Sequence, residues 1–405
     1  MPFDQRGGIA SRAERLSRPR PARRAVPRFP RNVVALSITS FLADVSGEML
    51  MAVLPFLLLA QGATGFDVGI TGGVSDAVGH LLKPVFGALA DRTRRRKPLV
   101  VGGYLLAASA RFGISASTQW FWSLAYRSAD RVGKGMRTAP RDAILAESAT
   151  KETRGRSFGL HRAADTAGAV VGVGLALLAL LVLRASDASI VFVGALIGLS
   201  TAIPLFFVRD EGPLAPAAAK AIAEPLSPRY RRYLVVAAIF AAGNVSYLFF
   251  VLRASDAVGG AVGAVALYLV FNVVYAAGAY PMGALSDRVG KPRVLAAGFL
   301  LFALAAALMA MPPTWWRALA AFVVMGGSFA CVDGVERAFA ADLAGSVARS
   351  TRLGVFQGVV GVATVLSGIA AGLLWDQVAP WAAFAWGAGV ALVALAALAL
   401  GGFLR

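Results

Sequence analysis

Charged residues are scarce in this sequence, and acidic residues are scarcer than basic ones. Asp, Glu, Lys and Arg make up 15% of the 405 residues, and 22 acids stand against 40 Lys and Arg. Soluble domains carry about 25% charged residues, so a soluble globular fold is excluded. Cysteine occurs once, as Cys331. This excludes a disulfide framework and a site with paired metal thiolates.

Long apolar runs are abundant instead. Hydrophobic residues make up 58% of the chain and the mean hydropathy is +0.67. Apolar stretches of roughly 20 residues, long enough to cross a ~30 Å hydrocarbon core as helix, recur along the sequence. We predict twelve spans, at 32–60, 67–90, 98–117, 120–142, 156–183, 189–208, 230–253, 258–284, 293–312, 315–342, 352–374 and 380–403. A membrane barrel would show alternating segments of about ten residues, so the sequence predicts an all-α integral membrane protein.

Basic residues gather in alternate breaks between the spans. One side of the predicted membrane receives clusters such as 92–97, 134–156, 229–232 and 288–293, whereas the other receives single cations such as Arg184 and Arg253. This asymmetry predicts an inner-membrane protein with both termini in the cytoplasm. The same pattern favours a basic surface facing anionic lipid over nucleic-acid binding. The Arg- and Pro-rich tail 1–31 lacks an apolar core, so it is interpreted as a disordered tail and not as a signal peptide.

A sequence repeat divides the chain into two halves. GALADRTRRRKP at 87–98 returns as GALSDRVGKP at 283–292, so that Gly87, Asp91 and Arg92 correspond to Gly283, Asp287 and Arg288. We predict two homologous six-helix bundles, 32–208 and 230–405, joined by a proline-containing cytoplasmic linker at 209–229. Such duplication is typical of transporters with a central site and alternating access.

The repeated motif resembles the loop signature of the major facilitator superfamily. The pattern G-x-x-x-D-R-x-x-R-R is carried by Gly87, Asp91, Arg92, Arg95 and Arg96, and the resemblance covers essentially everything after the tail. It implies two pseudo-symmetric six-helix bundles. It also implies a charged latch that holds the bundles together on the cytoplasmic side when the protein faces outward. A basic loop that only sets topology is the alternative.

Three charged residues of the tenth span are grouped with this latch. Asp333, Glu336 and Arg337 lie toward the cytoplasmic end of that span, and we expect them to pair with one another or with the latch loops.

Two further motifs resemble signatures of the same superfamily. Gly159, Gly168 and Gly172 have the spacing of the antiporter signature in the fifth span, with Val173 where proline is usual. That resemblance implies export, whereas ordinary close helix packing is the alternative. In the fourth span, Arg127, Asp130 and Arg131 loosely resemble a basic motif whose arginine assists proton transfer. The segments FLADVSGEM, DRVGKGMRTAPRDA and FGLHRAADTAGA resemble a prokaryotic branch whose substrates are mostly unassigned.

Ionisable side chains inside spans are costly and indicate function. They gather in the first half, where three spans carry them: Asp44 and Glu48; Asp76, His80 and Lys83; and His161, Arg162 and Asp165. Under the repeat, the counterparts of Asp44, Asp76 and His161 are Asn244, Asn272 and Phe356, so the scaffold does not require charge at these places. Buried ion pairs, Asp76 with Lys83 and His161 with Asp165, are the structural alternative.

These residues suggest a proton-coupled exporter. Acids and histidines at such depths can bind and release protons, and we hypothesise that Asp44, Glu48, Asp76 and His80 form the coupling centre. Cargo is expected to contact the lining residues Asn244, Tyr247, Asn272 and Tyr275. The predicted function is antiport of a small organic molecule by a monomer, driven by an ion gradient.

A divalent-metal transporter and a non-transporting sensor of the same fold remain alternatives. A membrane enzyme is disfavoured because no catalytic set or large extramembrane loop is visible. No cofactor or resident metal site is predicted, and Lys134 lies outside any phosphate-loop pattern.

Overall fold

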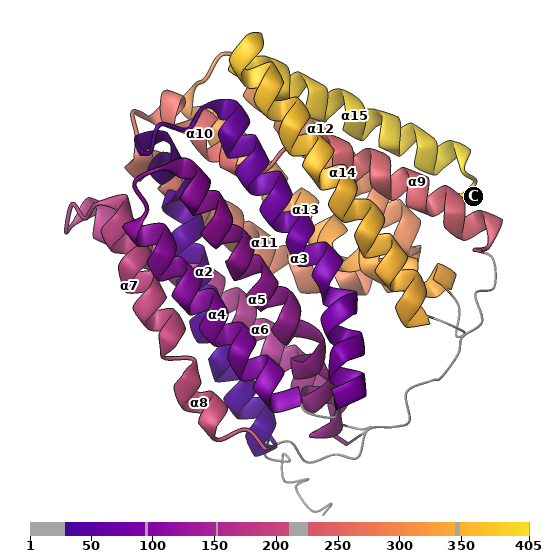
Figure 1. The fold of residues 1–405 in the computed structure, drawn as a ribbon. Helices are drawn as coiled ribbons and strands as arrows, with labels where there is room; N and C mark the ends of the chain where they lie inside the picture. Colours follow the sequence, from indigo (N-terminus) through magenta and orange to yellow (C-terminus); the bar gives the residue numbers. More distant parts are fainter. Residues whose placement is uncertain (1–28, 94–95, 151–152, 210–225, 345–348, 405) are drawn as a thin grey trace, which may run out of the picture.

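The computed structural model describes residues 29–93, 96–150, 153–209, 226–344 and 349–404. Over these residues the chain forms fourteen helices and no strands (Figure 1). Their bounds are α2 Arg31–Ala60, α3 Gly65–Thr93, α4 Arg96–Ala116, α5 Trp120–Glu147, α6 Arg154–Leu181, α7 Asp187–Leu199, α8 Ala202–Phe206, α9 Pro228–Gly243, α10 Tyr247–Val258, α11 Ala261–Val289, α12 Lys291–Ala310, α13 Trp315–Ala344, α14 Arg349–Gln377 and α15 Pro380–Leu400. The predicted tail and most of the predicted linker lie outside the described residues.

The prediction of twelve membrane crossings is confirmed, although two crossings are not continuous helices. The sixth is divided into α7 and α8, and the seventh into α9 and α10. The predicted spans 189–208 and 230–253 are thus present, and each contains a break in its helix. Pro204 lacks the N–H that would continue the ladder between α7 and α8. Asn244 leaves helical geometry with ψ at 80°, and the Ser246 hydroxyl then caps α10 by accepting from the Leu248 amide.

Ten of the twelve crossings are long and apolar enough to span a membrane by composition alone. The two that fall short are α3 and α5. Their polar residues include Asp76 and His80 on α3, and Asp130 and Arg131 on α5. These polar side chains lower the hydropathy of the two helices, which pack against each other.

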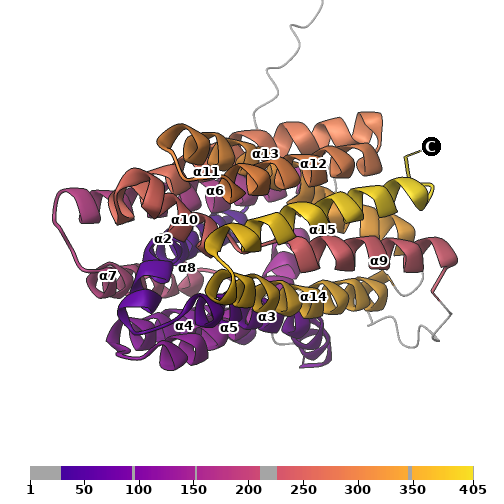
Figure 2. The ribbon, with the colours of Figure 1, turned by 90° about the horizontal axis from the view of Figure 1, so that it is seen from above.

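The two halves of the chain form two bundles that lie side by side (Figures 1 and 2). Helices α2–α8 build the first half and α9–α15 the second. The halves meet chiefly where α3 packs against α14 and where α6 packs against α11. This agrees with the predicted two-bundle membrane fold, while the boundaries proposed at 32–208 and 230–405 stay a prediction.

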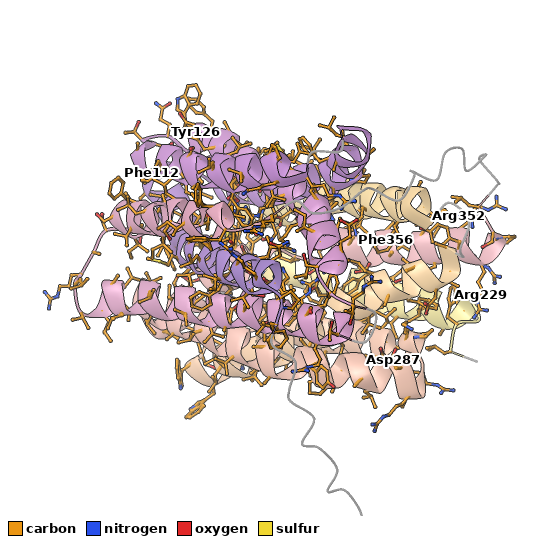
Figure 3. The ribbon with its side chains drawn as sticks, turned by 90° about the horizontal axis from the view of Figure 1, so that it is seen from below. Phe112, Tyr126, Arg229, Asp287, Arg352 and Phe356 are labelled. Atoms are coloured by element: carbon orange, nitrogen blue, oxygen red, sulfur yellow. The ribbon has the colours of Figure 1, made fainter. Side chains whose placement is uncertain are left out.

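One end of the protein carries most of the basic residues. At this basic end α2 begins at Arg31, α4 at Arg96, α6 at Arg154 and α12 at Lys291. The two halves approach one another at the opposite end and diverge toward the basic end (Figure 1). Seen from the basic end, Arg229, Asp287 and Arg352 lie at the outer part of the second half (Figure 3).

Candidate functional site

A cavity of about 240 Å³ lies between the two halves, near the middle of the helices. Helix α3 of the first half contributes to its wall, together with α13, α14 and the α9–α10 break of the second half. Its polar lining includes Asp76, His80, Asn244, Tyr247, Asp333 and Glu336. Titratable groups from both halves therefore line the same cavity.

Small residues allow the helices around the cavity to approach closely. A Cβ at Gly69 would lie 2.2 Å from the Gly368 carbonyl oxygen, so α3 and α14 touch through their backbones at this point. A Cβ at Gly72 would lie 3.2 Å from the hydroxyl of Ser246. Because α3 continues past this contact, His80 reaches α14 further along, where its Nδ1 lies 2.5 Å from Oε1 of Gln357.

Two of the acids at the cavity have arginine partners. Arg131 Nε of α5 lies 3.1 Å from Asp76 Oδ1, an ion pair without hydrogen-bond alignment. In the second half, Arg337 pairs with Asp333 at 2.6 Å, and the Tyr275 hydroxyl donates to the same carboxylate at 2.9 Å. The expected pairing within the tenth span is thus present for Asp333 and Arg337. The alternative pairing of Asp76 with Lys83 is not the one observed, because Arg131 reaches Asp76 from the adjacent helix.

Arg127 and Asp130 belong to a separate buried cluster. Asp130 receives Arg127 at 2.6 Å and Arg111 of α4 at 2.9 Å, and all three side chains are almost fully buried. Arg111 also donates to the Ser46 hydroxyl of α2 at 2.5 Å. The cluster ties α2, α4 and α5 together inside the first half. Arg111 was missed by sequence reasoning, although an arginine in the middle of the third span was a usable signal.

Asp44 and the fifth-span residues form a second polar group of the first half. Asp44 lies against α6, because a Cβ added at Gly168 would be 3.2 Å from the Cβ of Asp44. The Asp44 carboxylate interacts electrostatically with Asp165 and Lys134. His161 Nε2 lies 3.7 Å from Asp165 Oδ1. His161 is only 1% exposed, and neither ring nitrogen has a hydrogen-bond partner among the described residues. Arg162 lies 3.7 Å from Asp165 with its side chain 65% exposed.

Glu48 instead contacts the second half. The Tyr268 hydroxyl of α11 donates to its carboxylate at 2.8 Å, and the Asn272 side chain in turn donates to the Tyr268 carbonyl oxygen at 3.0 Å. Asn272 is buried, so its amide serves this local bond and is not among the residues that line the cavity. Asp44 and Glu48, one turn apart, thus face different neighbours, and neither lines the cavity with Asp76 and His80.

The described residues of the two repeated latch loops lie at the basic end, whereas Asp333 and Glu336, which were grouped with the latch, line the cavity. Arg96 pairs with Glu147 of the same half. In the second half, Lys291 bridges Asp287 at 3.6 Å and Asp342 at 2.8 Å. Gly87 has the Ala139 side chain as its neighbour, and Gly283 faces open space. The side chains of Asp91 and Arg92, and all of Arg95, lie outside the described residues, and no described contact involves the Arg288 side chain.

The glycines of the fifth-span motif have different surroundings. A Cβ at Gly168 would lie 2.5 Å from the Phe41 carbonyl oxygen, and one at Gly172 would lie 2.4 Å from that of Val45. These two glycines let α6 pack directly on the α2 backbone. A Cβ added at Gly159 would have no neighbouring atom within 4 Å.

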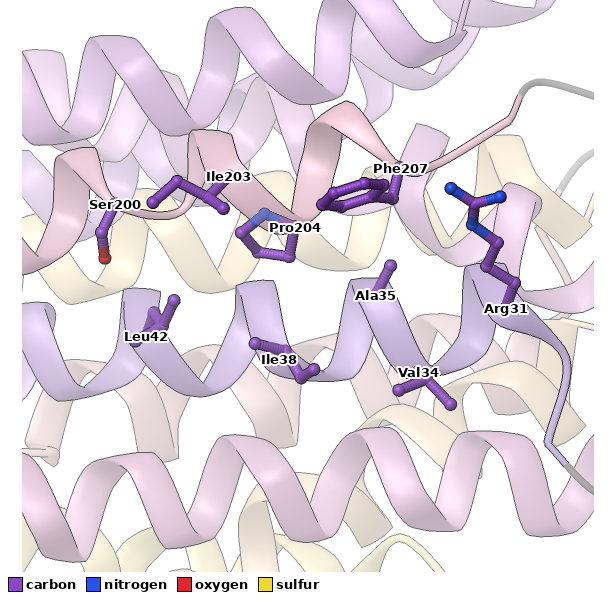
Figure 4. A pocket seen from close by; sticks show the side chains of 9 residues that line it. All are labelled: Arg31, Val34, Ala35, Ile38, Leu42, Ser200, Ile203, Pro204 and Phe207. Carbon is purple, nitrogen blue, oxygen red and sulfur yellow. The ribbon is translucent and has the colours of Figure 1, made fainter.

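The outer surface carries a second, more apolar groove. A larger groove of about 630 Å³ lies between α2 and α8 on the outer surface, lined by Ile38, Ile203, Phe207 and other apolar residues, with Arg31 at one end (Figure 4). It offers hydrocarbon contacts and little else. Among the described residues, no three His, Cys, Asp or Glu side chains come together to hold a metal ion.

Comparison with protein families decides the class of this molecule. The model of the Major Facilitator Superfamily matches residues 36–259 and 236–405. The chain belongs to the major facilitator superfamily. It is therefore a multi-pass membrane transporter whose fold binds a small molecule within the bilayer.

Several relatives of this superfamily member span nearly its whole length. An uncharacterized MFS-type transporter of Methanocaldococcus jannaschii is 35% identical over 373 residues, covering 90% of this chain and 93% of that protein. The class C tetracycline resistance protein of Escherichia coli is 27% identical over 88% of this chain and 93% of that protein. The solved structure of the nucleoside transporter NupG matches with a TM-score of 0.74 at 13% identity, covering 92% of this chain and all of that one. The last likeness concerns the fold alone.

Proposed function

We propose that this transporter exports a small organic molecule in exchange for protons, by alternating access to the cavity between its halves. The observation that carries the proposal is the shared lining: Asp76 and His80 of the first half face Asp333 and Glu336 of the second half across one space. Rocking the halves about this space would change the surroundings of all four groups at once. Groups that bind protons and cargo at the same place can couple the two movements.

The direction of opening supports a cytoplasmic assignment for the basic end. Loops rich in Lys and Arg remain on the cytoplasmic side of bacterial inner membranes, so both termini are assigned there. The halves diverge toward that end, and at the opposite end the Asp376 carboxylate accepts from the Gly65 and Phe66 amides at 2.9 and 2.8 Å. The described conformation corresponds to an inward-facing state.

Proton coupling is assigned to four acids and two histidines. Asp76 and His80 contact the cavity, Glu48 joins the halves through Tyr268, and Asp44 lies beside Asp165 and His161. Neither ring nitrogen of His161 has a hydrogen-bond partner among the described residues, and Asp165 Oδ1 accepts no hydrogen bond. Leaving such buried polar atoms without a hydrogen bond is costly. Their retention supports a role in proton movement. The relationship to a tetracycline resistance protein supports export as the direction.

Reconstituted protein tests the proposal. Purified full-length chain in proteoliposomes with an imposed pH gradient is exposed to a panel of small organic compounds, preselected by thermal shift. At least one compound is expected to move protons in wild type. Asp44→Asn and Glu48→Gln are expected to abolish this movement while leaving the unfolding temperature near that of wild type. Intact coupling in both variants, or no compound-driven proton movement in wild type, would contradict the proposal.

A further inference from the structure

The side chains that line the cavity include more acidic than basic groups. Its lining contains three carboxylates, Asp76, Asp333 and Glu336, and no lysine or arginine among the described lining residues. Arg131 neutralises Asp76 and Arg337 neutralises Asp333, both reaching in from beyond the lining. One lining carboxylate is thus left over.

That remaining group is Glu336. No described side chain or amide forms a hydrogen bond or ion pair with its carboxylate, and only its backbone oxygen is used, by the Tyr233 hydroxyl at 3.0 Å. The adjacent Arg337 directs its guanidinium to Asp333, bonding both the carboxylate at 2.6 Å and the backbone oxygen at 3.0 Å. A carboxylate in a membrane interior without a partner is costly, and a ligand cation would offset that cost through a charge-assisted hydrogen bond.

The rest of the lining favours an apolar body attached to that cation. Phe240, Phe329 and Tyr247 present aromatic rings, and Val332 and Val360 add aliphatic surface. Aromatic faces attract ammonium groups as well as hydrocarbon. The volume of about 240 Å³ lies below the ~300–1,000 Å³ usual for drug-sized ligands, so the ligand is small.

Resting on the proposed transport function, we infer that the cargo is a small organic amine, protonated on nitrogen and carrying an apolar or aromatic body, and that Glu336 anchors its ammonium group. The anchoring role distinguishes Glu336 from its neighbours, because binding an amine at Asp76 or Asp333 would first require displacing an arginine. An anionic compound would instead add a negative charge beside an unpaired carboxylate.

Three probes of nearly equal size test the charge preference. Phenethylamine, 2-phenylethanol and phenylacetate are titrated into detergent-purified full-length protein by calorimetry, without any ion gradient. The amine is expected to bind about tenfold more tightly than the alcohol, and phenylacetate is expected to show no binding. Glu336→Gln is expected to bring the amine to the affinity of the alcohol. Asp342→Asn, an exposed acid of the same helix that pairs with Lys291, is the matched control and is expected to keep the preference.

If Glu336→Gln unfolds at a clearly lower temperature, Glu336→Asp, which keeps the charge, is expected to retain the amine preference. Equal binding of amine and alcohol in wild type, absence of amine binding, or an amine preference that survives in folded Glu336→Gln overturns it. Amine binding without amine-driven proton movement in proteoliposomes would leave this inference standing and contradict the proposed antiport.

Discussion

The two halves of this transporter share an order of six membrane crossings but fill their interiors differently. In the second half, aromatic rings pack on one another, as where Phe240 stacks on Phe299 at 4.0 Å and Phe250 meets Phe384 at 5.0 Å. In the first half, Arg111, Asp130 and Arg127 form a buried ionic cluster.

The repeat makes this contrast specific. When the two halves are aligned so that Glu147 lies opposite Asp342, Asp130 corresponds to Met325 and Arg127 to Phe322. Met325 and Phe322 are both fully buried. The same scaffold position accepts an ion pair or a hydrocarbon side chain. Buried ion pairs add little net stability compared with apolar packing, yet they are strongly destabilising when one partner is lost. The first half therefore buries charged side chains at positions where the second half buries hydrocarbon.

Removing one partner of the ionic cluster should have the largest effect. Asp130→Asn leaves two buried arginines without a counter-charge, which is expected to cost about 3–5 kcal/mol of stability. At the counterpart, Met325→Leu preserves volume and is expected to cost less than about 1.5 kcal/mol. Thermal unfolding can be followed with a thiol-reactive dye, because the single cysteine, Cys331, is 4% exposed when folded. Equal losses in the two variants would remove the contrast between the halves.

The next comparison concerns the cavity. Asp76→Asn leaves Arg131 without its ion-pair partner, and transport is expected to fall about a hundredfold or more. Asn272→Ala, at the corresponding place of the second half, removes only a neutral bond to the Tyr268 carbonyl and is expected to cost less than about fivefold. Substrate-driven proton flux in proteoliposomes measures both. A loss in Asn272→Ala as large as that in Asp76→Asn would show that charge is not what separates the two halves at this site.

The smallest effect is expected at the end opposite the basic end. Asp376 of α14 accepts from the first two amides of α3, so its carboxylate joins the halves at a helix N-terminus. Because Asp376 is exposed, Asp376→Ala is expected to destabilise this closed end by about 1 kcal/mol, enough to raise the open population about fivefold.

Thr118 lies between α4 and α5 of the first half, and Val378 lies between α14 and α15 of the second half. Distances between spin labels at these two positions, in a Cys331→Ala background, measure that opening. Asp256→Ala is the control, since Asp256 pairs with Arg253 of its own half at 3.5 Å and should leave the distances unchanged. Unchanged distances in Asp376→Ala would show that this contact does not hold the halves together.

Much of the fold could be predicted because lipid imposes it. A span must be apolar and about 20 residues long, so the predicted 315–342 agrees closely with Trp315–Ala344 and 98–117 with Arg96–Ala116. The break after Gly243 was not predicted, because hydropathy does not register a turn whose polar groups are satisfied locally. The small signal was the Asn-Val-Ser sequence, in which Ser246 caps the next helix.

The site was predictable as a set of residues and not as a set of partners. Helical spacing placed Asp76 and His80 on one face with Lys83, yet Asp76 pairs with Arg131 of another helix and His80 meets Gln357 of the other half. Tyr268, which binds Glu48, carried no signal as a partner because 220 residues separate the two in the chain.

By itself the sequence determined that this chain lies in a membrane and that it is duplicated. It also determined that one half keeps charge where the other does not. All three can be read from the chain because hydrophobicity and repeated motifs are properties of the sequence itself. Only the tertiary structure decided which acids receive an arginine and which one, Glu336, faces the shared cavity without one. Ionic partners depend on how neighbouring helices rotate and cross, and those angles are set by close contacts such as that of Gly69 with Gly368.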